Sequence, residues 1–337
     1  MTTMRSRTGP VMGFAVFAAV LLSVPAVFTR VPLYTMSTAV LMVLLALAAL
    51  GLVPLAGRAR QVSLGQAAFY GIGGYTSAIL TTRYGLGGWW ALVAGALLSA
   101  AVAWLLGSLI FRAQGHYLSL ATLAFGLALA ALATQLPMTG GNAGITGVPA
   151  LSVLGIELSD DLSMYYVFAG MLLVATVAVQ VLLRSFWGAA LTAAGDSPVA
   201  AAASGVDVAG LRRTAFVVAA VLASVAGSGY ACWYRYVDPG VLGLLSSVEL
   251  LVIVSVGGRD SVWGAPLGAL GVVTLTQLSK EQIGPASGAS FELTAYGVIL
   301  ILSLLLLPRG LAGLPAILLG RWRRHRLTTG RIPREAR

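Results

Sequence analysis

The chain has 337 residues, of which 58% are hydrophobic and 9% are charged, and its formal net charge is +10 at pH 7. Soluble domains carry about 25% charged residues, so this composition excludes an ordinary soluble domain. The basic residues stand singly or in pairs between apolar runs, with a cluster at the C-terminus. This distribution excludes a nucleic-acid-binding patch and is typical of a membrane protein.

Apolar runs long enough to cross a bilayer recur along the chain and predict an all-α polytopic membrane protein with about 8–10 transmembrane helices. The N-terminal run, preceded by Arg5 and Arg7, resembles a signal peptide, but an uncleaved first span suits a chain that is otherwise membrane-embedded. The expected spans are 11–29, 34–56, 65–82, 88–111, 117–137, 163–183, 213–234, 242–257, 262–279 and 291–307. Two of them, 65–82 and 262–279, are candidates for re-entrant or broken segments, because Gly and Pro interrupt them.

The basic residues predict the orientation of these spans. With both termini inside, the inner loops carry ten Arg and the C-terminal segment another seven, whereas the outer loops carry Arg30, Arg83, Arg235 and Lys280. This bias favours cytoplasmic N- and C-termini. Residues 1–320 then form one transmembrane domain, and the basic tail at 321–337 lies at the cytoplasmic face near anionic lipid head groups.

Two connections are long. Residues 138–162 form an external loop without basic residues, and residues 184–212 form the largest internal loop. Within the internal loop, Gly195 predicts a helix end, and Asp196 or Ser197 can cap a new helix that has Pro198 at its first position and ends at Gly205. A short capped helix on the cytoplasmic face can dock into a partner or simply cover helix ends.

The stretch RQVSLGQAAFYGIGGYTSAIL at 60–80 combines an apolar character with many polar and glycine residues. Glycine permits close backbone approach, and broken membrane helices line cavities. We therefore expect this segment to line a pathway for a small solute. The candidate residues are Ser63, Gln66, Gly71, Gly73, Gly74 and Tyr75.

Catalytic chemistry is not indicated. A Walker A loop ends in Gly-Lys-Ser/Thr, but the single lysine, Lys280, lies in Ser-Lys-Glu. One cysteine, Cys232, and two histidines, His116 and His325, are too few for a Cys/His metal cluster. Glu249 falls two turns into an expected span, and an acid at that depth is a candidate functional residue because burying its charge is costly. Glu292, at the start of the last span, is more typical of an interfacial position.

Over most of its length the sequence resembles a known family. QVSLGQAAFYGIGGYTSAIL is similar to the hallmark segment of LivM-type permeases of branched-chain amino acid ABC transporters. Six further blocks resemble that family in the same order over residues 34–314. They are HYLSLATLAFG, TGGNAGITGV, DSPVAAAASGVDV, AFVVAAVLASVAGSGYACWYRYVDP, SVELLVIVSVGGRDSVWGAPLGA and LLPRGLAGL.

The resemblance implies a permease subunit, without ATPase or cofactor of its own, in a bacterial inner (plasma) membrane importer of Leu, Ile and Val. Its implied partners are a LivH-like permease, two cytoplasmic ATP-binding subunits that use the ATP, and a periplasmic or lipid-anchored substrate-binding protein. The helix at Asp196, Ser197, Pro198 and Gly205 would couple to the ATPase. Glu249 would orient helices or contact the amino group of the substrate.

The sequence departs from the family in two places. The segment before the coupling helix has only Arg184 where the family carries several Arg, and Arg259 and Asp260 replace small uncharged residues. Importers of urea, amides or aromatic acids look alike in sequence and stay open as alternatives. A passive small-solute channel would not need a docking helix, and a proton-coupled transporter would need Glu249 or Glu292 to titrate.

Overall fold

The computed structural model describes residues 8–28, 35–111, 117–153, 156–283, 297–298 and 310–313. Its α-helices are α1 (Thr8–Phe28), α2 (Met36–Leu50), α3 (Gln66–Tyr84), α4 (Gly88–Ile110), α5 (Tyr117–Gln135), α6 (Asp161–Arg184), α7 (Phe186–Asp196), α8 (Pro198–Ala203), α9 (Val208–Tyr234), α10 (Leu244–Gly257) and α11 (Gly264–Ile283). Except for residues 297 and 298, the expected last span at 291–307 lies outside the described residues, as do Glu292 and the tail at 321–337.

Shorter elements connect these helices. A π-helix, η1 (Val53–Arg58), follows α2. The 3-10 helices are η2 (Pro137–Thr139), η3 (Gly141–Ala143), η4 (Pro239–Leu242) and η5 (Leu311–Gly313). The strands are only two residues long: β1 (Ile145–Thr146) pairs antiparallel with β4 (Tyr236–Val237), and β2 (Ser152–Val153) pairs antiparallel with β3 (Ile156–Glu157).

An all-α polytopic membrane protein is confirmed. In the described part of the chain, four helices are long and apolar enough to cross a membrane: α4, most of α5, α6 and α9. Two expected spans are shorter as helices than as apolar runs, since α2 has 15 residues and α10 has 14. At the about 1.5 Å rise per residue of an α-helix, neither spans a 30 Å hydrocarbon layer alone.

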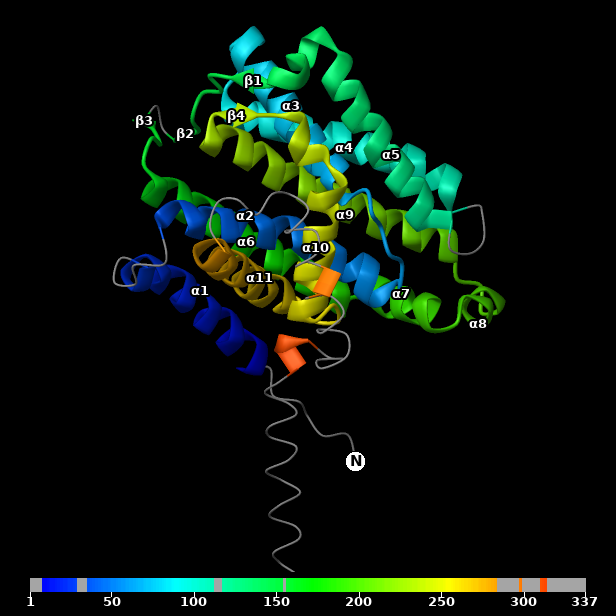
Figure 1. Ribbon diagram of the computed structural model, residues 1–337. Coiled ribbons are helices and arrows are strands. Elements are labelled where there is room, and N and C mark those ends of the chain that lie inside the picture. The colour runs from blue at the N-terminus through cyan, green and yellow to red at the C-terminus, as the bar shows by residue number, and fades with distance from the viewer. Residues whose placement is uncertain are drawn as a thin grey trace, which may run out of the picture.

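The connections gather at two opposite ends of the helix bundle (Figure 1). At one end, which we call the α7–α8 end, Gly195 packs against Arg58 and Gly57 packs against Arg259. At the other, the β1–β4 end, the strand pairs gather and Gly88 packs against Leu151. Among the described residues, loops that the charge bias predicts to be internal therefore share one end, and loops predicted to be external share the other.

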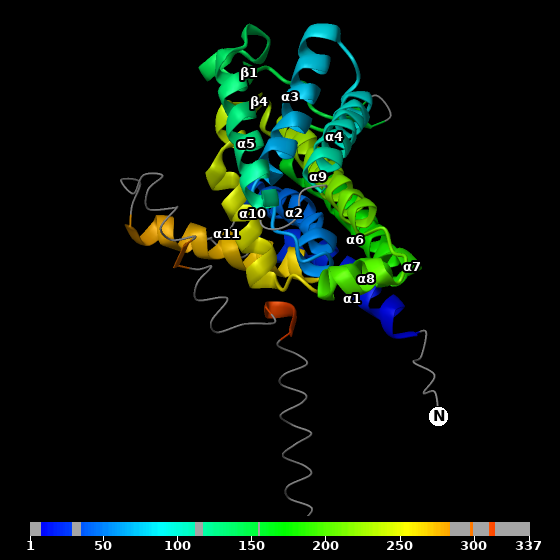
Figure 2. The ribbon, with the colours of Figure 1, turned by 90° about the vertical axis from the view of Figure 1, so that its right-hand side faces the viewer.

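Helix α9 is the centre of the bundle. In its apolar window 67% of the residues are buried, against 22% for α4 and α5 and 28% for α6. Figure 2 shows α3, α4 and α5 on one side of α9 and α10, with α1 and α11 on the opposite side. A polar side chain of α9 also bonds a neighbouring helix: the Ser228 hydroxyl donates to the Gly73 carbonyl of α3 at 3.1 Å.

Glycines set how closely α3 and α9 approach. A Cβ on Gly73 would overlap the Ser224 carbonyl, and a Cβ on Gly227 would overlap the Tyr70 carbonyl. In the same way, Gly268 of α11 meets the Ile253 carbonyl of α10. Apolar side chains gain nothing by leaving lipid for another apolar side chain, so close backbone packing of this kind holds membrane helices together.

The structure corrects one expectation about glycine. Neither candidate broken segment contains a break, because α3 runs without interruption over Gln66–Tyr84 and α11 over Gly264–Ile283. The non-helical stretch precedes α3, at residues 59–65. Gly73 and Gly74 of α3 lie where the backbone of α9 packs, and Gly71 lies against the Leu242 side chain. This packing keeps the helix intact despite a propensity cost of about 1 kcal/mol per Gly relative to Ala.

The close packing of α3 against α9 can be tested by adding a methyl group at Gly73. We expect Gly73→Ala to lower the free energy of unfolding by about 1–3 kcal/mol, because the added methyl forces the two helices apart. Gly170→Ala on α6 is the matched control, since a Cβ there meets no atom within 4 Å. Thermal unfolding of the purified proteins in detergent measures the difference, and equal midpoints for the two variants would contradict the packing argument.

Candidate substrate pathway and coupling surface

The non-helical segment 59–65 lies among helices at the α7–α8 end, and side chains of α5 bond its backbone. The Ser119 hydroxyl donates to the Val62 carbonyl at 2.9 Å, and the Leu64 amide donates to the Thr122 hydroxyl at 3.1 Å. Ser63 in the middle of the segment is fully buried. Irregular backbone is tolerated inside a membrane protein only where protein groups satisfy it, and α5 does so here.

Gln66 and Ser247 join four helices at the start of α3. The Gln66 amide nitrogen donates to the Ala219 carbonyl of α9 at 2.8 Å and lies 3.5 Å from the Ala48 carbonyl of α2. The Ala67 amide of α3 donates to the Ser247 hydroxyl of α10 at 3.1 Å. Both side chains are buried, so these bonds are shielded from water and fix where α2, α3, α9 and α10 meet.

A cavity of about 160 Å³ lies next to this junction, and Glu249 is part of its wall. Glu249 lies in the second turn of α10 and is half-buried. The rings of Tyr70 and Tyr230, whose centroids are 5.8 Å apart, form another part of the wall. The remaining lining residues are Leu41, Leu45, Ala67, Val241, Ser246 and Leu250.

This wall combines one carboxylate with aliphatic and aromatic surface. A carboxylate attracts an ammonium group, and tyrosine rings also attract cations through their faces. An engineered apolar cavity of about 150 Å³ accommodates benzene, so the cavity is on the scale of an aliphatic side chain. The arrangement can therefore receive a small molecule that has a cationic group and an apolar group.

Of the residues proposed from the sequence for the pathway, the structure places Glu249 in this wall. Gly71 packs against Leu242, Gly73 against Ser224, and Gly74 lies beside Gly227 and Val237. Ser63, Gln66 and Tyr75 are buried, and Tyr75 lies near Asp238 and Tyr236 of the β1–β4 end. For these six residues the structure shows packing contacts, and a role in lining the pathway stays a prediction.

Sequence reasoning missed Tyr70, Tyr230 and Ser246. Tyr70 lies within the polar and glycine-rich stretch at 60–80, four residues after Gln66 and so on the same face of α3. Ser246 precedes Glu249 by three residues on α10 and shares its face. The spacing could have indicated these two residues, whereas nothing local indicates Tyr230, which comes from α9.

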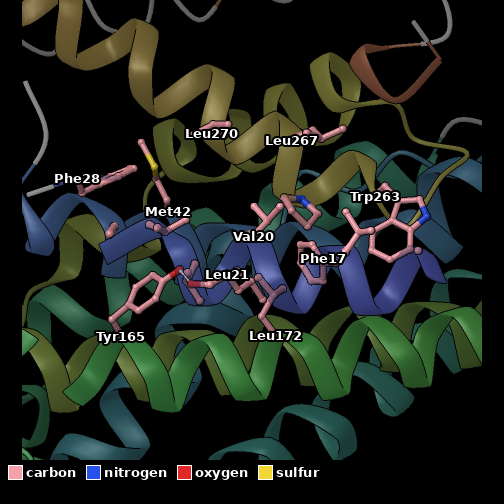
Figure 3. A pocket seen from close by; sticks show the side chains of 17 residues that line it. Phe17, Val20, Leu21, Phe28, Met42, Tyr165, Leu172, Trp263, Leu267 and Leu270 are labelled. Carbon is pink, nitrogen blue, oxygen red and sulfur yellow. Dashed lines mark hydrogen bonds between the residues drawn. The ribbon is translucent and has the colours of Figure 1, made fainter. Parts of the chain in front are cut away.

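A larger cavity of about 350 Å³ lies between α1, α2, α6 and α11 (Figure 3). Its wall is apolar, and the Tyr165 hydroxyl there already donates to the Leu21 carbonyl at 2.8 Å. At one end Trp263 packs against Phe14 and Phe17, with ring centroids 5.1 and 5.2 Å away. An isolated charge would be costly in such a wall, so the smaller cavity is the better candidate for a charged solute.

The predicted cap at the start of α8 is confirmed, whereas the predicted helix end at Gly195 is wrong, because Gly195 lies inside α7, which ends at Asp196. The Ser197 hydroxyl accepts a bond from the Ala200 amide, Pro198 opens α8, and Gly205 follows α8 with φ of 81°. Helix α8 projects from the bundle (Figure 1), and its Val199 side chain is 81% exposed. This short helix has an apolar, solvent-exposed side chain at the end where a partner can reach it.

Asp196 differs from the cap that the sequence allowed. Its carboxylate does not cap α8 but accepts a bond from the Arg60 guanidinium at 2.7 Å, across to the segment that precedes α3. Directly beneath, a Cβ on Gly195 would overlap the Arg58 carbonyl. Two adjacent contacts thus join the α7–α8 connection to residues 58–60.

Arg259 and Asp260, the two charged residues that depart from the family pattern, lie in the turn between α10 and α11. Both side chains are exposed, and the contact that the turn makes with Gly57 comes from the Arg259 carbonyl. Because the turn packs through its backbone, charged side chains are accommodated without burial.

Within the described residues, no group of three or more His, Cys, Asp or Glu residues could hold a metal ion.

Comparisons with known proteins agree with this architecture. The family model described as branched-chain amino acid transport system / permease component matches residues 34–307. The high-affinity branched-chain amino acid transport system permease protein LivM of Escherichia coli (strain K12) is 29% identical over 301 residues, which cover 82% of this chain and 69% of that protein. The protein of the same name from Salmonella typhimurium (strain LT2) is 29% identical over 286 residues, which cover 78% and 66%. No solved structure matches.

The junction at the start of α3 can be tested by removing one hydroxyl. We expect Ser247→Ala to lower the free energy of unfolding by about 1–3 kcal/mol, because the buried Ala67 amide loses its partner. Ser108→Ala is the matched control, since its hydroxyl bonds only the Leu105 carbonyl of its own helix. Chemical denaturation in detergent compares them, and an unchanged midpoint for Ser247→Ala would show that the bond does not hold the junction.

Proposed function

Because the chain belongs to the family of permease components of branched-chain amino acid transport systems, we propose that it forms one half of the membrane channel of an ATP-driven importer. The importer takes up leucine, isoleucine and valine across a bacterial inner membrane. The observation that carries the substrate class is the cavity at Glu249, where a carboxylate faces aliphatic walls. A branched-chain amino acid presents an ammonium group and an aliphatic side chain, which match these two parts of the wall.

In the proposed pathway, the amino acid binds briefly in the cavity at Glu249 before it moves on. Glu249 attracts the ammonium group, while Leu41, Leu45, Val241 and Leu250 receive the side chain. Passage requires that the site be favourable enough to enter and weak enough to leave, as in other membrane pathways. A single carboxylate beside small apolar surfaces suits this requirement, and selection is left to a separate binding protein that delivers the amino acid.

The energy for import comes from other subunits in this proposal. The chain contains no Gly-Lys-Ser/Thr sequence, so two cytoplasmic ATP-binding subunits hydrolyse the ATP. The capped helix α8 is the proposed docking element for one of them, and Val199 is the side chain that it offers. A second, homologous permease completes the channel.

The substrate assignment is tested by Glu249→Gln. We expect the rate of leucine uptake into proteoliposomes that contain the whole complex to fall at least about tenfold, equivalent to about 1.4 kcal/mol, because the amide cannot neutralise the ammonium group. Glu157→Gln is the matched control, an exposed acid in β3 at the β1–β4 end. Undiminished leucine uptake in Glu249→Gln would contradict the role of Glu249 in attracting the ammonium group, whereas absence of leucine uptake in the unchanged complex would favour a neutral solute such as urea or an amide.

The docking assignment is tested by Val199→Glu. We expect the variant to enter the membrane normally but to lose most of its bound ATP-binding subunit, because a charge then replaces the exposed apolar side chain of α8. Co-purification in mild detergent measures the retained subunit. Glu157→Lys, at the opposite end, controls for a change of surface charge, and full retention by Val199→Glu would place docking elsewhere.

A further inference from the structure

The contact between Arg60 and Asp196 joins two segments that lie 136 residues apart in the sequence. Arg60 follows the π-helix η1 in the connection that leads to α3, and Asp196 is the last residue of α7. The Arg60 and Asp196 side chains are 68% and 56% exposed. The pair therefore lies on the surface of the α7–α8 end, beside the capped helix α8.

Stability alone does not explain this pair. An exposed ion pair contributes little to folding, since water and salt screen it. The backbone at Arg60 also has φ of 52°, in the left-handed region that is unfavourable for residues other than glycine. Strained backbone persists where the surroundings fix it, and it is concentrated at binding sites and switch regions.

The pair lies between α8 and the cavity along a short run of bonded groups. On one side, Ser197 follows Asp196 directly and caps α8. On the other, the segment after Arg60 is held to α5 through Val62 and Leu64 and enters α3 at Gln66. The next residue, Ala67, bonds Ser247 and lines the cavity at Glu249.

Backbone packing reinforces the ion pair. Gly195 lies so close to the Arg58 carbonyl that a side chain does not fit between them. A displacement of the α7–α8 connection would therefore reach residues 58–60 through two contacts, the packing of Gly195 on Arg58 and the ion pair.

We propose that Arg60 and Asp196 act as positioning residues that transmit the movement of α8 to the segment 61–65 and thus to the start of α3 at the cavity wall. The proposal rests on the proposed function, because it takes α8 to be the docking element of an ATP-binding subunit. It assigns a role in coupling to Arg60, and it gives Asp196, which the family resemblance already implies in coupling, a partner 136 residues away. Couplings between distant sites amount to about 5–150-fold in equilibrium constants, so loss of the pair has a measurable effect.

The test compares transport with ATP use in the complete complex. Proteoliposomes containing both permeases, the ATP-binding subunits and the binding protein are assayed for leucine uptake and ATP hydrolysis in the same sample. The variants are Arg60→Asp, Asp196→Arg and the exchanged pair that carries both substitutions. Arg235→Asp is the matched control, because Arg235 is also exposed and also has positive φ, at 58°, but lies at the β1–β4 end.

We expect the amount of leucine moved per ATP hydrolysed to fall at least about fivefold in each single variant. The exchanged pair should recover most of this loss, and Arg235→Asp should show none. Recovery would show that the loss depends on opposite charges at the two positions and not on either residue alone, and the ratio of leucine to ATP is the readout that a merely structural contact would not change. Exposure of both side chains makes it possible to exchange them without burying a charge.

Three results would overturn the proposal. Unchanged leucine per ATP in both single variants would show that the pair transmits nothing. An exchanged pair as poor as the single variants would show that the charges act separately. Absence of ATP-driven leucine uptake in the unchanged complex would remove the proposed function and this inference together, whereas the first two results remove this inference alone.

Discussion

The structure depends on one constraint: backbone amides and carbonyls inside a membrane protein must all find partners in the protein. Helices satisfy this by themselves, but the segment 59–65 is not helical and still lies among helices. The hydroxyls of Ser119 and Thr122 take the place of the missing helical bonds, and Ser247 bonds the first turn of α3. These three side chains allow α3 to begin inside the bundle.

Close packing of α3 against α9 follows from the same arrangement. Once α3 is fixed at its start by Gln66 and Ala67, its next turns approach α9 so closely that Gly73 and Gly227 leave no room for side chains. Tyr70, one turn after Gln66, does carry a large side chain, and it meets Tyr230 at the edge of the cavity. The cavity therefore forms where α3 and α10 both begin and where packing changes from glycine to aromatic residues.

The two cavities differ in the chemistry of their walls as well as in their size. The larger one, between α1, α2, α6 and α11, offers apolar surface to whatever enters it (Figure 3). The smaller one has a carboxylate in its wall and lies beside the junction of four helices. Under the proposed function, the charged point of this wall receives the ammonium group of the amino acid and the apolar part receives its side chain.

The sequence by itself determined the properties that depend on neighbouring residues. Apolar runs predicted the membrane class and the positions of the helices, and Ser197, Pro198 and Gly205 predicted the short helix α8, because a cap is formed by residues adjacent in the chain. The ordered family blocks indicated the permease family, and the match over residues 34–307 confirmed it. The glycine pattern at Gly71, Gly73 and Gly74 does not by itself decide between a helix break and a close helix contact.

Only the tertiary structure decided what those residues meet. It placed α9 against α3, so that glycines expected to interrupt a helix serve to pack it, and it brought Tyr230 to the cavity wall beside Glu249. It also paired Asp196 with Arg60, 136 residues away, where the sequence had suggested a local cap. Such contacts join segments far apart in the chain, and their partners are set by how the helices are arranged in space.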